Sequence, residues 1–149
     1  RTSEVIGACW DEFDLNLGLW TIPPDRMKVG KEHRVPLSSQ ANVILKGINS
    51  NRKPEDFVFH GWKSGSGLSN GAMLMLMKKI GFGPYTPHGF RSTFRDWAAE
   101  KAYHFHNETV ELALAHTIRN RSEAAYRRGD QLEKRRELMQ LWSDYVEKT

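Results

Sequence analysis

Two side chains suited to phosphate chemistry stand three positions apart near the start of a predicted helix. His88 and Arg91 are at i and i+3, so both project from one side of the first helical turn. A cation, an imidazole and the free backbone amides of a helix N-terminus together favour an anion such as phosphate. Taken alone, the pair is weak evidence, because His-x-x-Arg occurs by chance in many helices.

Tyr126 is a candidate nucleophile that stands between two alanines and two arginines, in Ala124-Ala125-Tyr126-Arg127-Arg128. A core tyrosine would have apolar neighbours instead. Its phenol, with an ordinary pKa of about 10, is a poor nucleophile until nearby cations favour the phenolate. The local sequence by itself favours a surface tyrosine in cation–π contact with the arginines.

The positive charge of the chain is concentrated around this tyrosine. The cations of the stretch are Arg119, Arg121, Arg127, Arg128, Lys134, Arg135 and Arg136, against the carboxylates Glu123, Asp130 and Glu133. Their balance of +4 equals the net charge of all 149 residues. Such a stretch attracts polyanions, and a solvated helix face is the alternative interpretation.

Other chemistry is poorly supported by the sequence. His104 and His106 form a His-x-His without a neighbouring Asp or Cys cluster, which favours surface histidines and predicts no metal site. Cys9 is the single cysteine, so it excludes an internal disulfide, fits a reducing cytoplasm and is interpreted as a small buried residue. No apolar run is long enough to span a bilayer, so a cytoplasmic protein is predicted.

The N-terminal elements that must position these residues are a helix end and three short strands. Residues 2–9 are predicted to end a helix, and strands are predicted over 10–15, 19–22 and 31–37 with a turn at 16–18. They should form a small antiparallel sheet. The chain starts without Met, which suggests a fragment of a longer protein.

The rest of the pattern is helical. Helices are predicted from Ser38 or Ser39 to about residue 49, from Ser69 or Asn70 to near residue 81, from Thr86-Pro87 onward, over 107–115, around Tyr126, and at the C-terminus. Phe90, Phe94, Trp97 and Ala98 are predicted to form a buried stripe, as are the methionines of the second helix. Leu132, Met139, Trp142 and Val146 are predicted to form the apolar face of the last helix. The fold class is α+β, a mostly helical single domain.

The order of these residues resembles that of the tyrosine recombinases, the phage integrase family. The similar segments are Arg1-Thr2-Ser3-Glu4 (first arginine box), residues 28–37 (β-hairpin with the lysine), His88-Gly89-Phe90-Arg91 (central box), Leu114-Ala115-His116, and Tyr126 ten positions after His116. The resemblance covers essentially the whole chain and is nearest to integrases of temperate phages and genomic islands. Ala115 departs from the usual Gly, a mild change if the backbone there is helical.

The resemblance implies the catalytic core of a DNA breaking-rejoining enzyme over residues 1–149, with upstream helices and DNA-binding domains absent. It implies catalytic roles for Arg1, Lys28, His88, Arg91, His116 and Tyr126, with a 3′-phosphotyrosyl intermediate and neither ATP nor metal. Lys31 is the alternative to Lys28 as general acid. Arg95, Arg119, Arg121, Arg127 and Arg128 are candidate DNA contacts, and Arg95 has a solvated position as its alternative.

The resemblance also implies partners: double-stranded DNA attachment sites, a tetramer on DNA in the full-length protein, and host bending factors or an excisionase. Nucleoid association would follow from DNA binding. The last helix packs either on its own domain or on a neighbouring subunit, and the sequence leaves both open. A metal-dependent nuclease, a DNA-binding module without chemistry and a type IB topoisomerase are the competing functions.

Overall fold

The three predicted strands form one antiparallel sheet in the computed structural model, which describes residues 1–48, 51–63, 65–116 and 129–148. Their order is β1 (Phe13–Asp14), β2 (Leu19–Ile22) and β3 (His33–Pro36). β2 pairs with β3 from Leu19↔Pro36 to Ile22↔His33. Ile22 of β2 is buried, so this end of the sheet packs against the interior. The prediction of a small sheet near the N-terminus is confirmed.

The first strand is shorter than predicted because its early amides bond elsewhere. Trp10–Glu12 forms the 3₁₀ helix η1, and the amides of Trp10 and Asp11 donate to carbonyls of Asp56 and Pro54 at 3.1 and 2.8 Å. Those amides therefore cannot form hydrogen bonds with a neighbouring strand. The turn into β2 is closed by Asp14, whose carboxylate accepts from two following amides at 3.0 and 2.8 Å. Strand prediction over 10–15 was wrong in its first half.

The helices lie close to their predicted ranges. They are α1 (Thr2–Ile6), α2 (Ser39–Ile48), α3 (Ala72–Lys79), α4 (Gly89–Lys101), α5 (Asn107–Ala113) and α7 (Leu132–Glu147). α1 ends three residues earlier than predicted, because Cys9 pairs in a bridge with Phe57. Cys9 itself is partly buried. Asn107 begins α5 rather than capping it, since His106 is the N-cap.

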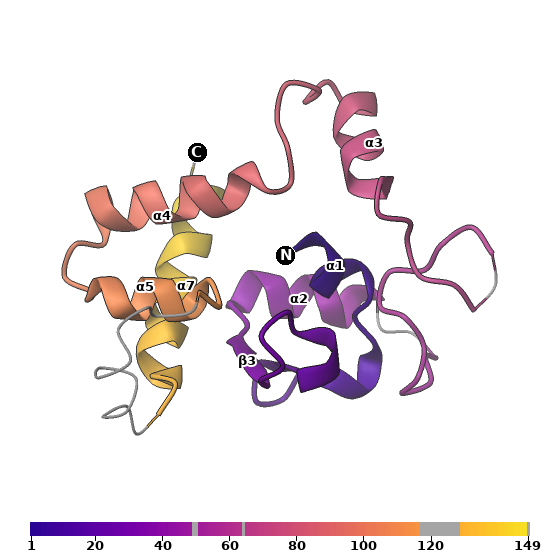
Figure 1. Ribbon diagram of the computed structural model, residues 1–149, viewed down its shortest axis with the longest axis horizontal. Coiled ribbons are helices and arrows are strands. Elements are labelled where there is room, and N and C mark those ends of the chain that lie inside the picture. Colours follow the sequence, from indigo (N-terminus) through magenta and orange to yellow (C-terminus); the bar gives the residue numbers. More distant parts are fainter. Residues whose placement is uncertain (49–50, 64, 117–128, 149) are drawn as a thin grey trace.

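A core of buried apolar side chains joins α4, α5 and α7. Figure 1 shows α7 running across α4 and α5, with the chain's N-terminus between this group and the group of α1, α2 and the sheet. Leu138 of α7 is fully buried, and Trp142 meets Phe94 edge-on with ring centroids 5.6 Å apart. Burying a Leu or Phe side chain contributes about 2 kcal/mol. In this single chain the last helix therefore packs on its own domain.

Three predicted apolar stripes are only partly correct. Phe94, Trp97 and Ala98 are buried, but Phe90 is 59% exposed because it faces a pocket beside α3 rather than the core. On α3 only Met77 is buried, whereas Met75 and Leu76 are exposed. Figure 1 shows why, since α3 stands away from the other helices on extended connections. Val146 is exposed as well, and the buried face of α7 centres on Arg135 and Leu138.

Within the part of the chain that the structure describes, no helix has both the length and the apolar character needed to cross a membrane.

Candidate active site

The start of α4 is preceded by a turn that the side chain of Thr86 closes. Thr86 Oγ1 accepts a hydrogen bond from the amide of Gly89, the first residue of α4, at 3.1 Å. The N-cap of the helix is His88, with angles of φ −69° and ψ −32°, rather than Thr86 as the sequence predicted. The turn therefore fixes where His88 and Arg91 project.

Arg91 reaches from α4 to the end of α5. Its NH2 donates to the carbonyl of Leu114 at 2.5 Å and lies 3.0 Å from Nε2 of His116. Burial lowers the pKa of Arg91, and the nearby positive charge of Arg1 lowers it further, while Glu4 and Glu111 oppose the change. Arginine nevertheless stays charged at neutral pH. The central box and the Leu-Ala-His element are thus joined directly.

The end of α5 presents its carbonyls through a left-handed residue. Ala115 has φ +51°, its amide donates to Leu112 O at 3.0 Å, and the amide of His116 donates to Glu111 O at 2.9 Å. This pair of bonds is a Schellman motif, in which Gly usually holds the left-handed position. The expectation of helical backbone at Ala115 is therefore wrong. Ala115, which stands where the family usually has Gly, is therefore strained.

His116 is held by a carboxylate that the sequence reasoning missed. Its Nδ1 lies 2.6 Å from Oε2 of Glu111, and Oε1 of Glu111 lies 3.0 Å from Nε of Arg95. The second contact is an ion pair without hydrogen-bond alignment. Arg95 is therefore not simply solvated, and no contact with DNA is shown. It forms an ion pair with Glu111. A spacing of five does not bring side chains together on a regular helix, so the contact depends on the turn at Ala115.

Arg1 completes the cluster from the other end of the chain. Its guanidinium donates to Glu4 at 2.7 Å and to Ala115 O at 3.3 Å. The side chain of Arg1 is therefore held in place, with Glu4 as its partner.

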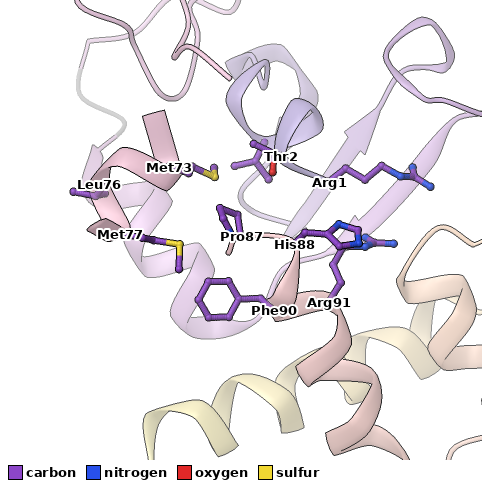
Figure 2. Close-up of a pocket in the computed structure, with 10 residues that line it drawn as sticks. Arg1, Thr2, Met73, Leu76, Met77, Pro87, His88, Phe90 and Arg91 are labelled. Atoms are coloured by element: carbon purple, nitrogen blue, oxygen red, sulfur yellow. The ribbon is translucent and has the colours of Figure 1, made fainter. Parts of the chain in front are cut away.

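Arg1, His88 and Arg91 also share one pocket, of about 400 Å³, between α1, α3 and α4. Figure 2 shows their nitrogen-bearing ends on one side of the pocket and the side chains of Met73, Met77 and Phe90 on the other. The structure therefore brings together Arg1, His88, Arg91 and His116. These four residues, which were predicted as catalytic, are called the polar cluster below.

The lysine candidates lie away from these contacts. Lys28 and Lys31 are exposed in the loop between β2 and β3, where Gly30 takes φ +65°. Neither makes a hydrogen bond or ion pair with another described residue. The structure thus places both on the predicted hairpin and does not separate them.

Five predicted residues lie outside the described ranges: Tyr126, Arg119, Arg121, Arg127 and Arg128. His104 and His106 are exposed. Among the described residues no group of three or more His, Cys, Asp or Glu side chains is arranged to hold a metal ion.

Comparison with known proteins gives a consistent result. The model of the Phage integrase family matches residues 1–132. The chain is 36% identical over 148 residues to Prophage integrase IntA of Escherichia coli strain K12, 32% over 164 to Integrase of Enterobacteria phage P4, and 33% over 150 to Integrase of Shigella phage Sf6.

These alignments cover 98 to 99% of the chain but only 35, 37 and 38% of the respective relatives. The chain thus spans little more than a third of the length of the relatives that it matches. No solved structure gave a significant match. With the family model covering most of its length, the chain belongs to the phage integrase family.

Proposed function

We propose that residues 1–149 form the catalytic domain of a longer site-specific DNA recombinase that cleaves and rejoins strands through Tyr126. The observation that supports this most is the polar cluster, in which Arg91 binds Leu114 O beside His116 while Arg1 binds Ala115 O. Two guanidinium groups and two imidazoles from three separate segments suit the non-bridging oxygens of a phosphodiester.

The proposed reaction is a transesterification. The Tyr126 oxygen bonds to phosphorus as the P–O5′ bond breaks, giving a 3′-phosphotyrosyl link and a 5′-hydroxyl. His88 accepts the tyrosine proton, and Lys28 donates a proton to the departing oxygen, with Lys31 as the alternative donor. Arg1, Arg91 and His116 bind the phosphate oxygens. The covalent link retains the bond energy for rejoining, so the reaction needs neither ATP nor metal.

The proposed substrates are double-stranded attachment sites of a phage or genomic island, bound by a tetramer. Arg119, Arg121, Arg127 and Arg128 are proposed to contact the DNA backbone, and so is Arg95 through the guanidinium nitrogens that do not face Glu111. Host bending factors or an excisionase are the proposed accessory partners.

The test is covalent capture with the longest natural form of the protein. A nicked attachment-site duplex releases a short fragment after cleavage, so the adduct accumulates and is counted on a denaturing gel. Wild type is expected to yield a 3′-linked adduct in the presence of EDTA, and Tyr126→Phe is expected to yield none while still binding DNA. Tyr103→Phe, at a tyrosine that is 80% exposed, is the matched control and should keep the adduct.

An adduct that survives in Tyr126→Phe would overturn the assignment of the nucleophile. Cleavage that EDTA abolishes, with no protein attached to DNA, would instead favour a metal-dependent nuclease.

A further inference from the structure

The contact between Glu111 and His116 determines which nitrogen of the imidazole carries a proton. Nδ1 of His116 lies 2.6 Å from Oε2 of Glu111, a length typical of a hydrogen bond to a charged group. An ionised carboxylate only accepts hydrogen bonds. Nδ1 must therefore be the protonated nitrogen, whatever the state of Nε2.

The other side of the ring faces a group that only donates. Nε2 of His116 lies 3.0 Å from NH2 of Arg91, and a guanidinium has no acceptor. Without DNA, Nε2 consequently accepts, and His116 is the neutral Nδ1–H tautomer. Its Nε2 lone pair is directed toward the arginine that lines the pocket.

Glu111 is itself fixed between the two helices. Its side chain is 17% exposed, and Arg95 Nε lies 3.0 Å from its second oxygen. Arg95 stands one turn after Arg91 on α4, so two arginines of one helix hold Glu111 and His116 of the α5 end. The charged groups facing His116 are thus Glu111 at the end of α5 and Arg91 on α4, with Arg1 and Arg95 next to them.

We infer that Glu111 is a positioning residue for strand cleavage: it sets the tautomer and the ring plane of His116 so that Nε2 faces the phosphate. This inference rests on the proposed function. Nε2 donates to a phosphate oxygen only when both ring nitrogens are protonated, and the carboxylate at Nδ1 compensates that charge. Glu111 touches neither phosphate nor tyrosine in this role and acts through His116.

The first measurement does not depend on activity. Nitrogen NMR of the labelled imidazole of His116 is expected to show the Nδ1–H tautomer in the wild type without DNA. Glu111→Gln should keep it, because the amide oxygen still accepts from Nδ1, whereas Glu111→Ala should lose it. An Nε2–H tautomer in the wild type, or no change in Glu111→Ala, would overturn the inference even if the protein cleaves DNA.

The second measurement is the single-turnover rate of adduct formation. Glu111→Ala is expected to be slower by roughly 10- to 100-fold, by analogy with the range for residues that orient metal-binding histidines. Glu111→Gln should be slowed less than Glu111→Ala, because its amide oxygen still accepts from Nδ1 but no longer compensates the charge of the ring. Glu100→Ala, which removes an exposed carboxylate of α4, should stay within about threefold of wild type. Equal losses in Glu111→Gln and Glu111→Ala would contradict positioning through Nδ1.

A double-mutant cycle separates positioning from general damage. If Glu111 acts through His116, Glu111→Ala should cost little in a His116→Ala background, because the shared interaction is already gone. If the rate losses of the two single variants multiply in the double variant, Glu111 does not act through His116. If wild type forms no adduct but shows the Nδ1–H tautomer, the proposed function fails while the Glu111–His116 contact stands.

Discussion

At the scale of single residues, Ala115 holds a left-handed backbone next to the polar cluster. Its φ of +51° lies in the left-handed region, which costs a residue with a Cβ about 1–2 kcal/mol. The conformation persists because the turn aims the carbonyls of Leu114 and Ala115 at Arg91 and Arg1. The cost of the strained backbone at Ala115 is therefore offset by the contacts that assemble the site.

Ala115→Gly is therefore expected to stabilise the protein. The left-handed angles become favourable, and after the greater freedom of Gly in the unfolded chain is subtracted, the free energy of unfolding should rise by about 1 kcal/mol. Urea denaturation measures it. Ala113→Gly, within α5, is the control and should lower the free energy by about 1 kcal/mol. Destabilisation by both changes would contradict the strained turn.

Residue-scale features were predictable only where they depend on nearby sequence. A polar turn at Thr86 was predictable because its side chain accepts from an amide only three positions away, although the N-cap itself is His88. The left-handed turn at Ala115 was not predictable, because nothing in Leu-Ala-His distinguishes it from helix. Glu111 was missed for the same reason, since its reach to His116 depends on that turn.

At the scale of elements, a charged cluster joins the start of α7 to β3. Asp130 accepts a pair of hydrogen bonds from Arg34 at 3.0 and 2.7 Å and another from Arg135 at 2.7 Å. Arg135 is 1% exposed and also donates to the carbonyl of Arg34 at 2.5 Å. Burial would raise the pKa of Asp130, but its bond from Arg34 and the charge of Arg135 hold it below the ordinary value.

Asp130→Asn is expected to be strongly destabilising. It leaves the buried guanidinium of Arg135 without a compensating charge, which costs about 3 kcal/mol after allowing for the partial exposure of Asp130. The matched change Glu133→Gln removes an exposed partner of Arg136 and should cost under about 0.5 kcal/mol. Chemical denaturation of both variants measures the difference. Similar costs for the two changes would show that the cluster does not anchor α7.

Element positions were predicted better than element faces. Caps and turns are local, so α2, α5 and β2 began and ended near their expected residues. The faces were less reliable because tertiary neighbours decide them. Phe90 faces a pocket, Met75 of α3 is exposed, and Arg135 occupies a buried position that periodicity would give to an apolar residue.

At the scale of the whole molecule, acid should weaken the fold through His33. Burial lowers the pKa of His33 from an ordinary value of 6.5 to about 4, and the charge of Arg135 adds to this, while Glu4 and Asp130 oppose it. Because the folded pKa is depressed, the unfolded chain binds the proton first. The stabilisation is complete above pH 6.5 and is lost as the pH falls toward 4.

The expected loss over that window is about 2 kcal/mol, less than the full shift because the ring keeps some contact with solvent. Urea titrations at a series of pH values measure it. His33→Gln should flatten the dependence between pH 6.5 and 4, whereas His104→Gln, at an exposed histidine, should leave it unchanged. If the loss of stability between pH 6.5 and 4 persists in His33→Gln, other groups cause it.

The family and four members of the polar cluster were predictable because the motifs occur in order along the chain. Their actual contacts were not, since they depend on how distant segments meet. Arg1 reaches Ala115, and Arg34 reaches Asp130, across more than ninety positions. Tyr126 stays a prediction, because it lies outside the described residues.

The bond from Arg1 to Ala115 also has a consequence during synthesis. It joins residues 114 positions apart, and the ribosome synthesises the N-terminal partner first. Closing a loop of that length precedes any gain from the contact. A chain interrupted before Ala115 therefore carries Arg1 and Arg91 without the carbonyls that hold them. Translation products interrupted before Ala115 should therefore lack the contacts that assemble the polar cluster.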